Sequence, residues 1–414
     1  MDKNQKLYVI YRIFGYEYMF YTVINFLYFT ITKGISVGQV MYLSGFYAAF
    51  CFMLQIPINF VIEKIGLKKS MNIGNLCWII HILIIIFTNN FYLFVIGEMF
   101  SALGTTFKTL SEQQYLYASL KQTKTRSKFG KIEGKSVAGY YMFEAISALF
   151  VGFLFEINQY IPIYLTLLFM CLSFALSLMF ENIKLDYSKK KNNFTKYLND
   201  FKLVLKSKRI KAIYVYVLCV TSIVTLTLTL QKSFVSNLEI SPVIYGFILS
   251  IFTLCIGLGS RLQYKFEKKA KRKTLTYVGV AITGLIVLAG ILSQILVPVN
   301  KYFALIFIII IFIIHNTSQG IYRISVKKYL NNFTNSDIRG KVLSMFYIFE
   351  GVGKSVIMFV AGYVIDNIGT NYTAILIGVI STCILLFILK YMKKHVGLNE
   401  DEYSKEDLWS DLKN

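Results

Sequence analysis

The sequence predicts an all-α integral membrane protein with twelve transmembrane helices arranged as two similar six-helix halves. Three observations lead to this prediction. Hydrophobic residues make up 56% of the 414-residue chain and charged residues only 16%, whereas soluble domains carry about 25% charge. The apolar residues form twelve long segments, each near the roughly 20 residues that cross a bilayer. The longest polar stretch divides these segments six and six.

The twelve apolar segments follow one another with short connections. Glycine and β-branched residues inside them do not argue against helices, because lipid forces every backbone hydrogen bond into the segment itself. We expect spans at residues 8–31, 38–62, 71–88, 91–117, 136–156, 161–181, 210–231, 243–264, 274–296, 302–326, 341–364 and 372–392. The N-terminal half then covers 1–183 and the C-terminal half 210–395, with a basic linker at 184–209 and an acidic tail at 396–414.

Basic residues are unevenly distributed between the connections, which predicts the orientation of the chain. Connections after even-numbered spans are rich in Lys and Arg, as in "EKIGLKKS" and "SLKQTKTRSKFGKIEGK", whereas those after odd-numbered spans, such as "TNN" and "EINQY", have almost none. Cytoplasmic connections carry this excess of Lys and Arg. We therefore expect both termini in the cytoplasm. The net charge of +22 reflects this topology, with added attraction to anionic membrane lipid.

The same residues argue against several other classes of protein. A nucleic-acid binder would gather its basic residues on a soluble face with a recognition motif. The phrase Gly-Val-Gly-Lys-Ser at 351–355 resembles the end of a phosphate-binding loop, but Ile348 stands where the first glycine is required. The six cysteines lie inside apolar segments without Cys-x-x-Cys spacing. We expect no nucleic acid, metal or cofactor, and no enzyme, because no nucleophile with an oriented base occurs.

The two halves also resemble each other in sequence. The stretch "FGKIEGKSVAGYYMFEAISALFVGFLFEI" aligns with "RGKVLSMFYIFEGVGKSVIMFVAGYVIDN" at a constant offset of 210 residues. Gly152 and Glu156 in the first half match Gly362 and Asp366 in the second. A parallel repeat of two six-helix halves is the architecture of one large class of secondary transporters.

The loop between the second and third spans, "NFVIEKIGLKKSM", resembles the signature G-x-L-a-D-r-x-G-r-k-x-x-l of the major facilitator superfamily, with Asn59 in place of the leading glycine. The matching residues are Glu63, Lys64, Gly66, Lys68 and Lys69, and a weaker match in the second half contains Glu267 and Lys268. The resemblance implies alternating access around a cavity lined by spans one, four, seven and ten, with these loops latching the halves together on the cytoplasmic side. The alternative is an ordinary basic cytoplasmic loop.

Polar and ionisable residues at membrane depth are candidates for substrate binding or proton coupling, because each ionisable group is costly to bury there. The candidates are Glu17, Glu98, Glu112, Glu144, His315, Gln319, Arg323, Glu350 and Lys354. Glu17 lies about 13 Å into the first span and would bind a cation or carry a proton. Its alternative role is to pair with Arg12, although a five-residue spacing is poor for a pair within one helix.

Two spans depart from the pattern of the proton-coupled drug exporters in this family. Glu98 stands where many of them have the arginine of R-x-x-x-G-x-G, so a carboxylate would serve a cationic substrate or a proton instead. The alternative is a water-exposed residue near the outer end of the span. The fifth span holds Glu144 at about 12 Å depth. It lacks the proline of the exporter motif, which leaves uptake as an open alternative.

Spacing groups the remaining candidates. His315, Gln319 and Arg323 recur every four residues, which predicts one shared helical face. His315 would titrate near physiological pH, or it is a hydrogen-bonded structural histidine. Glu350 and Lys354 have the spacing and order of a favourable i,i+4 ion pair, which would be structural or part of the coupling network.

These features together predict a secondary transporter that moves a small organic solute by alternating access, exporting it in exchange for protons. We expect a monomer in the cell membrane, and the abundance of Lys, Asn, Ile and Tyr suggests a bacterial source. Two alternatives remain. The first is a symporter that takes up a nutrient such as a sugar, peptide or amino acid, and the second is a transporter-derived receptor or accessory protein without turnover.

Overall fold

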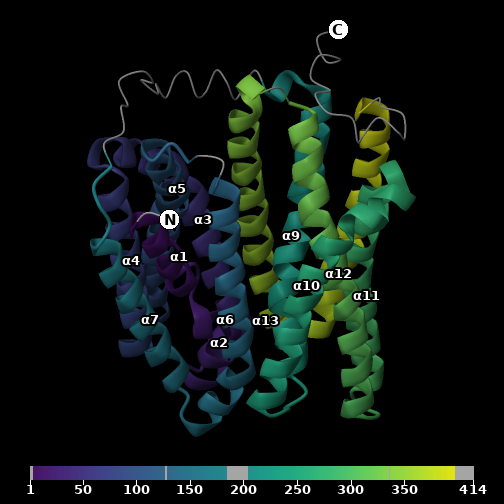
Figure 1. The fold of residues 1–414 in the computed structure, drawn as a ribbon. Helices are drawn as coiled ribbons and strands as arrows, with labels where there is room; N and C mark the ends of the chain where they lie inside the picture. The colour runs from purple at the N-terminus through teal and green to yellow at the C-terminus, as the bar shows by residue number, and fades with distance from the viewer. Residues whose placement is uncertain (1–2, 126–127, 184–203, 335, 397–414) are drawn as a thin grey trace. The chain divides into compact units, whose positions relative to one another are not determined.

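The computed structural model describes most of the chain as helix. The described residues are 3–125, 128–183, 204–334 and 336–396, and no strand occurs among them. Figure 1 shows the long helices. The chain is thus the all-α membrane protein that the composition predicts. Most of the expected basic linker and nearly all of the acidic tail lie outside the described residues, so both stay predictions.

The contacts divide the chain into two compact units. The N-terminal unit comprises Met1–Asn192 and Ser241–Phe247, and the C-terminal unit comprises Asn193–Ile240 and Ile248–Asn414.

The N-terminal unit begins with a span that is broken where the sequence predicts one continuous helix. Its helices are α1 (Lys3–Gly15), α2 (Met19–Leu27), the π-helix η1 (Tyr28–Thr32), α3 (Val37–Ile65), α4 (Leu67–Phe87), α5 (Phe91–Gln122), α6 (Phe129–Ile157) and α7 (Ile161–Leu178). The break follows Gly15, where α1 lies so close to Ser173 of α7 that an added Cβ would collide with it. Ser36 and Gln39 form a capping box that fixes the start of α3.

The C-terminal unit contains the remaining helices. They are α9 (Lys208–Ser236), α10 (Pro242–Ala270), the 3₁₀-helix η4 (Lys271–Lys273), α11 (Thr274–Leu296), α12 (Lys301–Asn332) and α13 (Ser336–Val396). The first residues of α10, up to Phe247, are counted with the N-terminal unit. Side-chain caps begin two of them, with Ser207 accepting from the N–H of Ile210 and Asn300 from that of Tyr302. The eleventh and twelfth predicted spans are the two parts of α13. They meet at Gly369, whose φ of +76° is readily adopted only by glycine.

The number of membrane helices agrees with the twelve predicted spans once three features are considered. Nine helical segments of the described chain are long and apolar enough to cross a membrane. One of these, Met345–Val396, contains both spans of α13. The broken first span and the polar α5 are not among the nine. Counting α13 as two spans and adding the first span and α5 to the other helices gives the twelve predicted spans.

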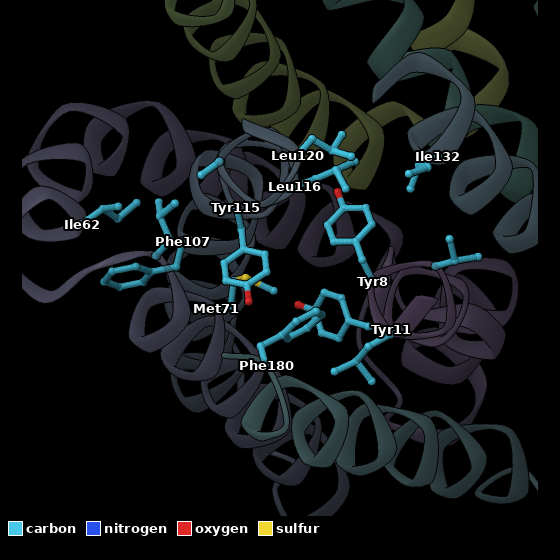
Figure 2. Close-up of a cluster of buried hydrophobic side chains, with 14 of the residues drawn as sticks. Tyr8, Tyr11, Ile62, Met71, Phe107, Tyr115, Leu116, Leu120, Ile132 and Phe180 are labelled. Atoms are coloured by element: carbon cyan, nitrogen blue, oxygen red, sulfur yellow. The ribbon is translucent and has the colours of Figure 1, made fainter. Parts of the chain in front are cut away.

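A cluster of buried aromatic and aliphatic side chains holds α1 against α4 and α5 (Figure 2). Tyr11 of α1 packs edge-on against Phe180, with ring centroids 5.4 Å apart, and Tyr115 of α5 packs against the same ring at 4.9 Å. Met71 of α4 is completely buried in the cluster. This packing fixes the position of Arg12, the residue after Tyr11, relative to α5.

Candidate functional site

A cavity of about 310 Å³ lies within the N-terminal unit beside the break in the first span. Its lining comes from α1, the break, α2, α3, α4 and α5. The lining residues are Arg12, Tyr16, Glu17, Tyr18, Thr22, Tyr47, Trp78, Thr105, Lys108, Thr109, Glu112 and Gln113. The cavity therefore combines aromatic rings with four ionisable groups of both signs.

Arg12 joins α1 to two other helices at one wall of the cavity. Its guanidinium pairs with Glu112 of α5 through Nη1 and with Glu133 of α6 through Nη2, the latter at 3.1 Å. The guanidinium carbon also lies 4.2 Å from the centroid of the Tyr16 ring. Because the side chain is nearly buried, these contacts replace the water that a charged group would otherwise bind.

Lys108 supplies a second buried cation on the same carboxylate. Its Nζ lies 3.1 Å from Oε1 of Glu112 and donates to Asn75 at 2.7 Å and to the Tyr11 hydroxyl oxygen at 3.0 Å. The Tyr11 hydroxyl in turn donates to Glu112. Nζ also lies 4.4 Å from the Trp78 ring, within cation–π range. Glu112 thus meets two cations and a phenol.

We name this set the Arg12 network: Tyr11, Arg12, Asn75, Lys108, Glu112 and Glu133. Together with Glu17, the network and the cavity contain two cationic and three anionic side chains. If all are ionised, one negative charge is left over. The site thus has a charge that suits a bound cation or an added proton.

The structure places Glu17 at the cavity, in the break between α1 and α2. Its side chain is exposed, in contrast to the buried Arg12 and Glu112. Arg12 is paired with Glu112 and Glu133, so it does not depend on Glu17 for neutralisation. Glu17 and Glu112 are the two predicted candidates that the fold brings to one cavity.

Glu98 and Glu144 lie outside the cavity lining. Glu98 on α5 and Glu144 on α6 are each only 9% exposed. The alternative of a water-exposed Glu98 is therefore wrong. The reason is that the first span, although broken, still packs close to this part of α5: the Tyr18 hydroxyl donates to Ser101 at 3.1 Å.

The C-terminal unit holds a second group of buried polar residues on α12. His315, Asn316 and Gln319 are completely buried, and Asn316 donates to Gln231 of α9 at 3.0 Å. Neither ring nitrogen of His315 has a hydrogen-bond partner within the described part of the chain. Arg323 is exposed and does not share their environment. The predicted common face fails there because eight residues at about 100° each turn the side chain about 80° away.

Glu350 and Lys354 form the ion pair that their spacing predicts. The Nζ of Lys354 lies 2.7 Å from Oε1 of Glu350, one helical turn apart on α13. The Lys354 side chain is 35% exposed and the Glu350 side chain is 20% exposed. The pair therefore neutralises both charges locally, while its part in coupling stays a prediction.

Comparison with known proteins identifies the family. A family model of the Major Facilitator Superfamily matches residues 13–326, which is well over half of the chain. The chain belongs to the Major Facilitator Superfamily. Among curated proteins no match is found.

Solved structures of this superfamily share the fold. A variant of the nucleoside transporter NupG has a TM-score of 0.74 at 12% identity, covering 94% of this chain and 100% of that one. A D-xylose-proton symporter has a TM-score of 0.70 at 12% identity, covering 97% and 98%. A POT family transporter in complex with 5-aminolevulinic acid has a TM-score of 0.69 at 15% identity, covering 95% and 96%. Identities this low establish the fold alone.

The loop that resembles the superfamily signature has the turn its sequence predicts. Gly66 separates α3 from α4 with a φ of +86°, so α4 begins directly at Leu67. In the second half, Glu267 is buried, lies 3.1 Å from Nζ of Lys328 and accepts from Gln263. The remaining residues of both loops are at least partly exposed: Glu63, Lys64, Lys68, Lys69 and Lys268. Their role in gating stays a prediction.

Sequence reasoning missed several members of the Arg12 network. Asn75 is one of a few polar residues in a strongly apolar span. Glu133 lies in a basic stretch whose composition is typical of a surface loop. Tyr11 is one of 30 tyrosines. The usable signal was Lys108, which lies four residues before Glu112 and at the depth of a membrane span. Among the described residues, no group of three His, Cys, Asp or Glu side chains forms a metal site.

Proposed function

We propose that this member of the Major Facilitator Superfamily exports a small organic solute by alternating access in exchange for protons. The observation that carries the proposal is the cavity of the N-terminal unit, in which Glu17 adds a carboxylate to an Arg12 network whose cations are already paired. We further propose a multi-pass protein of the cell membrane with both termini in the cytoplasm, as the basic connections indicate.

The lining of the cavity favours an organic cation as the solute. Tyr16, Tyr18, Tyr47 and Trp78 line the space, and aromatic faces attract cations when water is excluded. The rings of Tyr16 and Trp78 already contact Arg12 and Lys108, respectively. The surplus negative charge acts in the same direction. An anionic solute would instead have to compete with Glu112 for Arg12 and Lys108.

Exchange follows if the solute and a proton compete for one negative charge. A proton on Glu17 would remove the surplus charge and weaken the hold on a cation. Binding of the cation would in turn favour release of the proton, because a nearby positive charge lowers proton affinity. Each alternating-access cycle would then carry one of the two in each direction.

Symport of a neutral nutrient is the second candidate. It is supported by the absence of the exporter proline from α6 and by solved relatives that include a D-xylose-proton symporter. In that case the protonated, neutral form of Glu17 would bind the solute together with the proton. The two candidates therefore predict opposite directions of solute flux along one proton gradient.

Flux measurements in proteoliposomes with an imposed pH gradient test the proposal. Panels of organic cations, sugars, peptides and amino acids are screened for saturable transport. We expect a cation to move against the direction of proton flow. We expect Glu17→Gln to reduce the pH-driven component of solute flux at least tenfold. Asp366→Asn, at an exposed carboxylate on α13, serves as the matched control and should transport normally.

Three outcomes would contradict parts of this proposal. Undiminished pH-driven flux in Glu17→Gln would exclude the coupling role of Glu17. Solute movement with the protons would favour the symporter. Absence of saturable flux for every class, with binding retained, would favour the receptor.

A further inference from the structure

Four aromatic residues line the cavity of the N-terminal unit, and three of them already contact a cation or another ring. The Tyr16 ring lies 4.2 Å from the guanidinium carbon of the Arg12 network, and the Trp78 ring lies 4.4 Å from Nζ of its lysine. Tyr18 packs against Trp78 with ring centroids 4.4 Å apart. Tyr47 of α3 contacts no cation and no other ring in the described part of the chain. It is therefore the ring that remains for a cationic solute.

Tyr47 and Trp78 come from helices that the family resemblance does not place at the cavity. The resemblance implies a lining from spans one, four, seven and ten, whereas Tyr47 lies on α3, the second span, and Trp78 on α4, the third. Gly104 of α5 makes room for the indole, because an added Cβ there would lie 2.3 Å from Cδ1 of Trp78. Close packing on α5 thus brings a tryptophan of α4 to the cavity.

One hydroxyl group on α5 holds both of these side chains. The Tyr47 hydroxyl donates to Oγ1 of Thr105 at 3.1 Å, and Nε1 of Trp78 donates to the same oxygen at 3.2 Å. Nε1 also donates to the backbone carbonyl of Ser101, one turn earlier, at 3.3 Å. A hydroxyl oxygen has two acceptor lone pairs, so these two bonds use both of them. Thr105 therefore orients its two neighbours and has no acceptor left for a solute.

Glu17 supplies the negative charge beside Tyr47. Both residues line the cavity, and they lie within electrostatic range of each other. A cation within about 6 Å of a ring centroid is attracted to the ring face, and a carboxylate on its other side adds to this attraction. The cavity of about 310 Å³ is at the lower end of the range of about 300–1,000 Å³ for ligand pockets. The solute that fits is therefore small.

We propose that Thr105 is a positioning residue that holds Tyr47 and Trp78 at the cavity for a small alkylammonium solute. The ammonium group binds against the Tyr47 ring and the Glu17 carboxylate. An alkylated ammonium suits this site because its charge is carried on apolar groups that pack on an aromatic face and need few hydrogen-bond acceptors. The proposal rests on the proposed function, because it specifies the cation and the side chains that recognise it.

Equilibrium binding of labelled choline to the purified full-length protein tests the role of Thr105. We expect the wild type to bind choline, Thr105→Val to bind it about tenfold more weakly, and Thr105→Ser, which keeps the hydroxyl, to bind it nearly as the wild type does. Thr106→Val is the matched control. Thr106 is the next residue of α5, is 6% exposed, lies outside the cavity lining and donates to the carbonyl of Ala102 in its own helix.

The uncharged isostere 3,3-dimethylbutanol separates recognition of the charge from a general effect on the fold. Tyr47→Leu removes the ring and should weaken binding of choline much more than binding of the isostere. Tyr47→Phe keeps the ring, loses the bond to Thr105 and should have a smaller effect. These two variants test the site even if Thr105→Val folds poorly. Equal weakening of both compounds in Tyr47→Leu would overturn the proposal.

Tryptophan fluorescence reports where choline binds. The chain contains two tryptophans, Trp78 and Trp409, so Trp409→Phe leaves the cavity tryptophan as the only one. We expect choline to change its emission with the dissociation constant found by equilibrium binding. An emission that stays constant while choline binds would place the choline elsewhere and overturn the proposal.

The remaining outcomes distinguish this proposal from the proposed function. Absence of choline binding, or wild-type binding in Thr105→Val and Tyr47→Leu, would overturn the assignment of these residues. If proton-driven flux of a cation is undiminished in both variants, the export proposal stands and this inference fails. If choline binding depends on Thr105 but no pH-driven flux is found, the binding site stands and the proposed exchange fails.

Discussion

At the scale of single residues, the N-terminal unit is organised around buried charges that satisfy one another. Arg12 contacts carboxylates on α5 and α6, and Lys108 contacts side chains on α1, α4 and α5. The desolvation cost of such pairs can equal their attraction, so a buried network contributes little net stability. Removing one partner is different, because the others stay buried and lose their countercharge. The network therefore selects one arrangement of these helices.

Replacing Arg12 should be strongly destabilising. Arg12→Met leaves Glu133 without its cation and Glu112 with Lys108 alone, and breaking a buried pair in this way costs about 3–5 kcal/mol. Thermal unfolding in detergent measures the effect. Lys354→Met is the control, because its pair is partly exposed and should cost about 1 kcal/mol or less. Equal shifts in the two variants would show that burial does not decide the effect.

At the scale of helices, close backbone contact determines how α10 and α12 pack. An added Cβ at Gly259 would collide with the carbonyl oxygen of Thr317, and one at Gly320 would collide with that of Ile256. Small residues permit this approach in membrane proteins, where association depends on van der Waals contact. Gly257, two residues before Gly259, has open space around its Cβ position.

The two neighbouring glycines of α10 should therefore respond differently to alanine. Gly259→Ala must separate the backbones of α10 and α12 and should destabilise the protein by about 1–3 kcal/mol. Gly257→Ala meets nothing and should be neutral or stabilising by up to about 1 kcal/mol, because alanine favours helix. Thermal unfolding of both variants under identical conditions makes the comparison. A destabilised Gly257→Ala would contradict the packing described here.

The broken first span shows what tertiary packing adds to an element. Its residues are apolar enough to predict one helix, yet Tyr16, Glu17 and Tyr18 separate α1 from α2. Across the break the backbone is held by other helices: Gly15 lies against Ser173, and the N–H of Tyr21 donates to Thr166 of α7 at 3.2 Å. Hydropathy cannot reveal such contacts, because they involve residues about 150 positions away in the chain.

At the scale of the whole molecule, the alternation of basic and uncharged connections predicts the orientation in the membrane. Lys131 and Ile157 lie at opposite ends of α6 and are both exposed. Single cysteines at these positions, in a background lacking the six native cysteines, report the side on which each end lies. We expect a membrane-impermeant maleimide to label Ile157→Cys in intact cells and Lys131→Cys after permeabilisation alone. The opposite pattern would invert the proposed topology.

The features that depend on local chemistry can be predicted from the sequence. Long apolar segments require helices in lipid, so the spans and the fold class follow from composition and length. The Glu350–Lys354 pair follows from helical spacing, and the turn at Gly66 from the freedom of glycine. The two signature-like loops and the internal repeat indicate the Major Facilitator Superfamily.

Which polar residues contact one another depends on the tertiary structure. Arg12 finds its partners 100 and 121 residues away, and an apolar sequence pattern carries no information about pairings at that separation. The same holds for His81 of α4, whose ring lies 5.3 Å from that of Tyr18 in the first span. Charges buried in a membrane protein must be neutralised by whatever packs against them. Their partners and roles therefore depend on the packing of the helices.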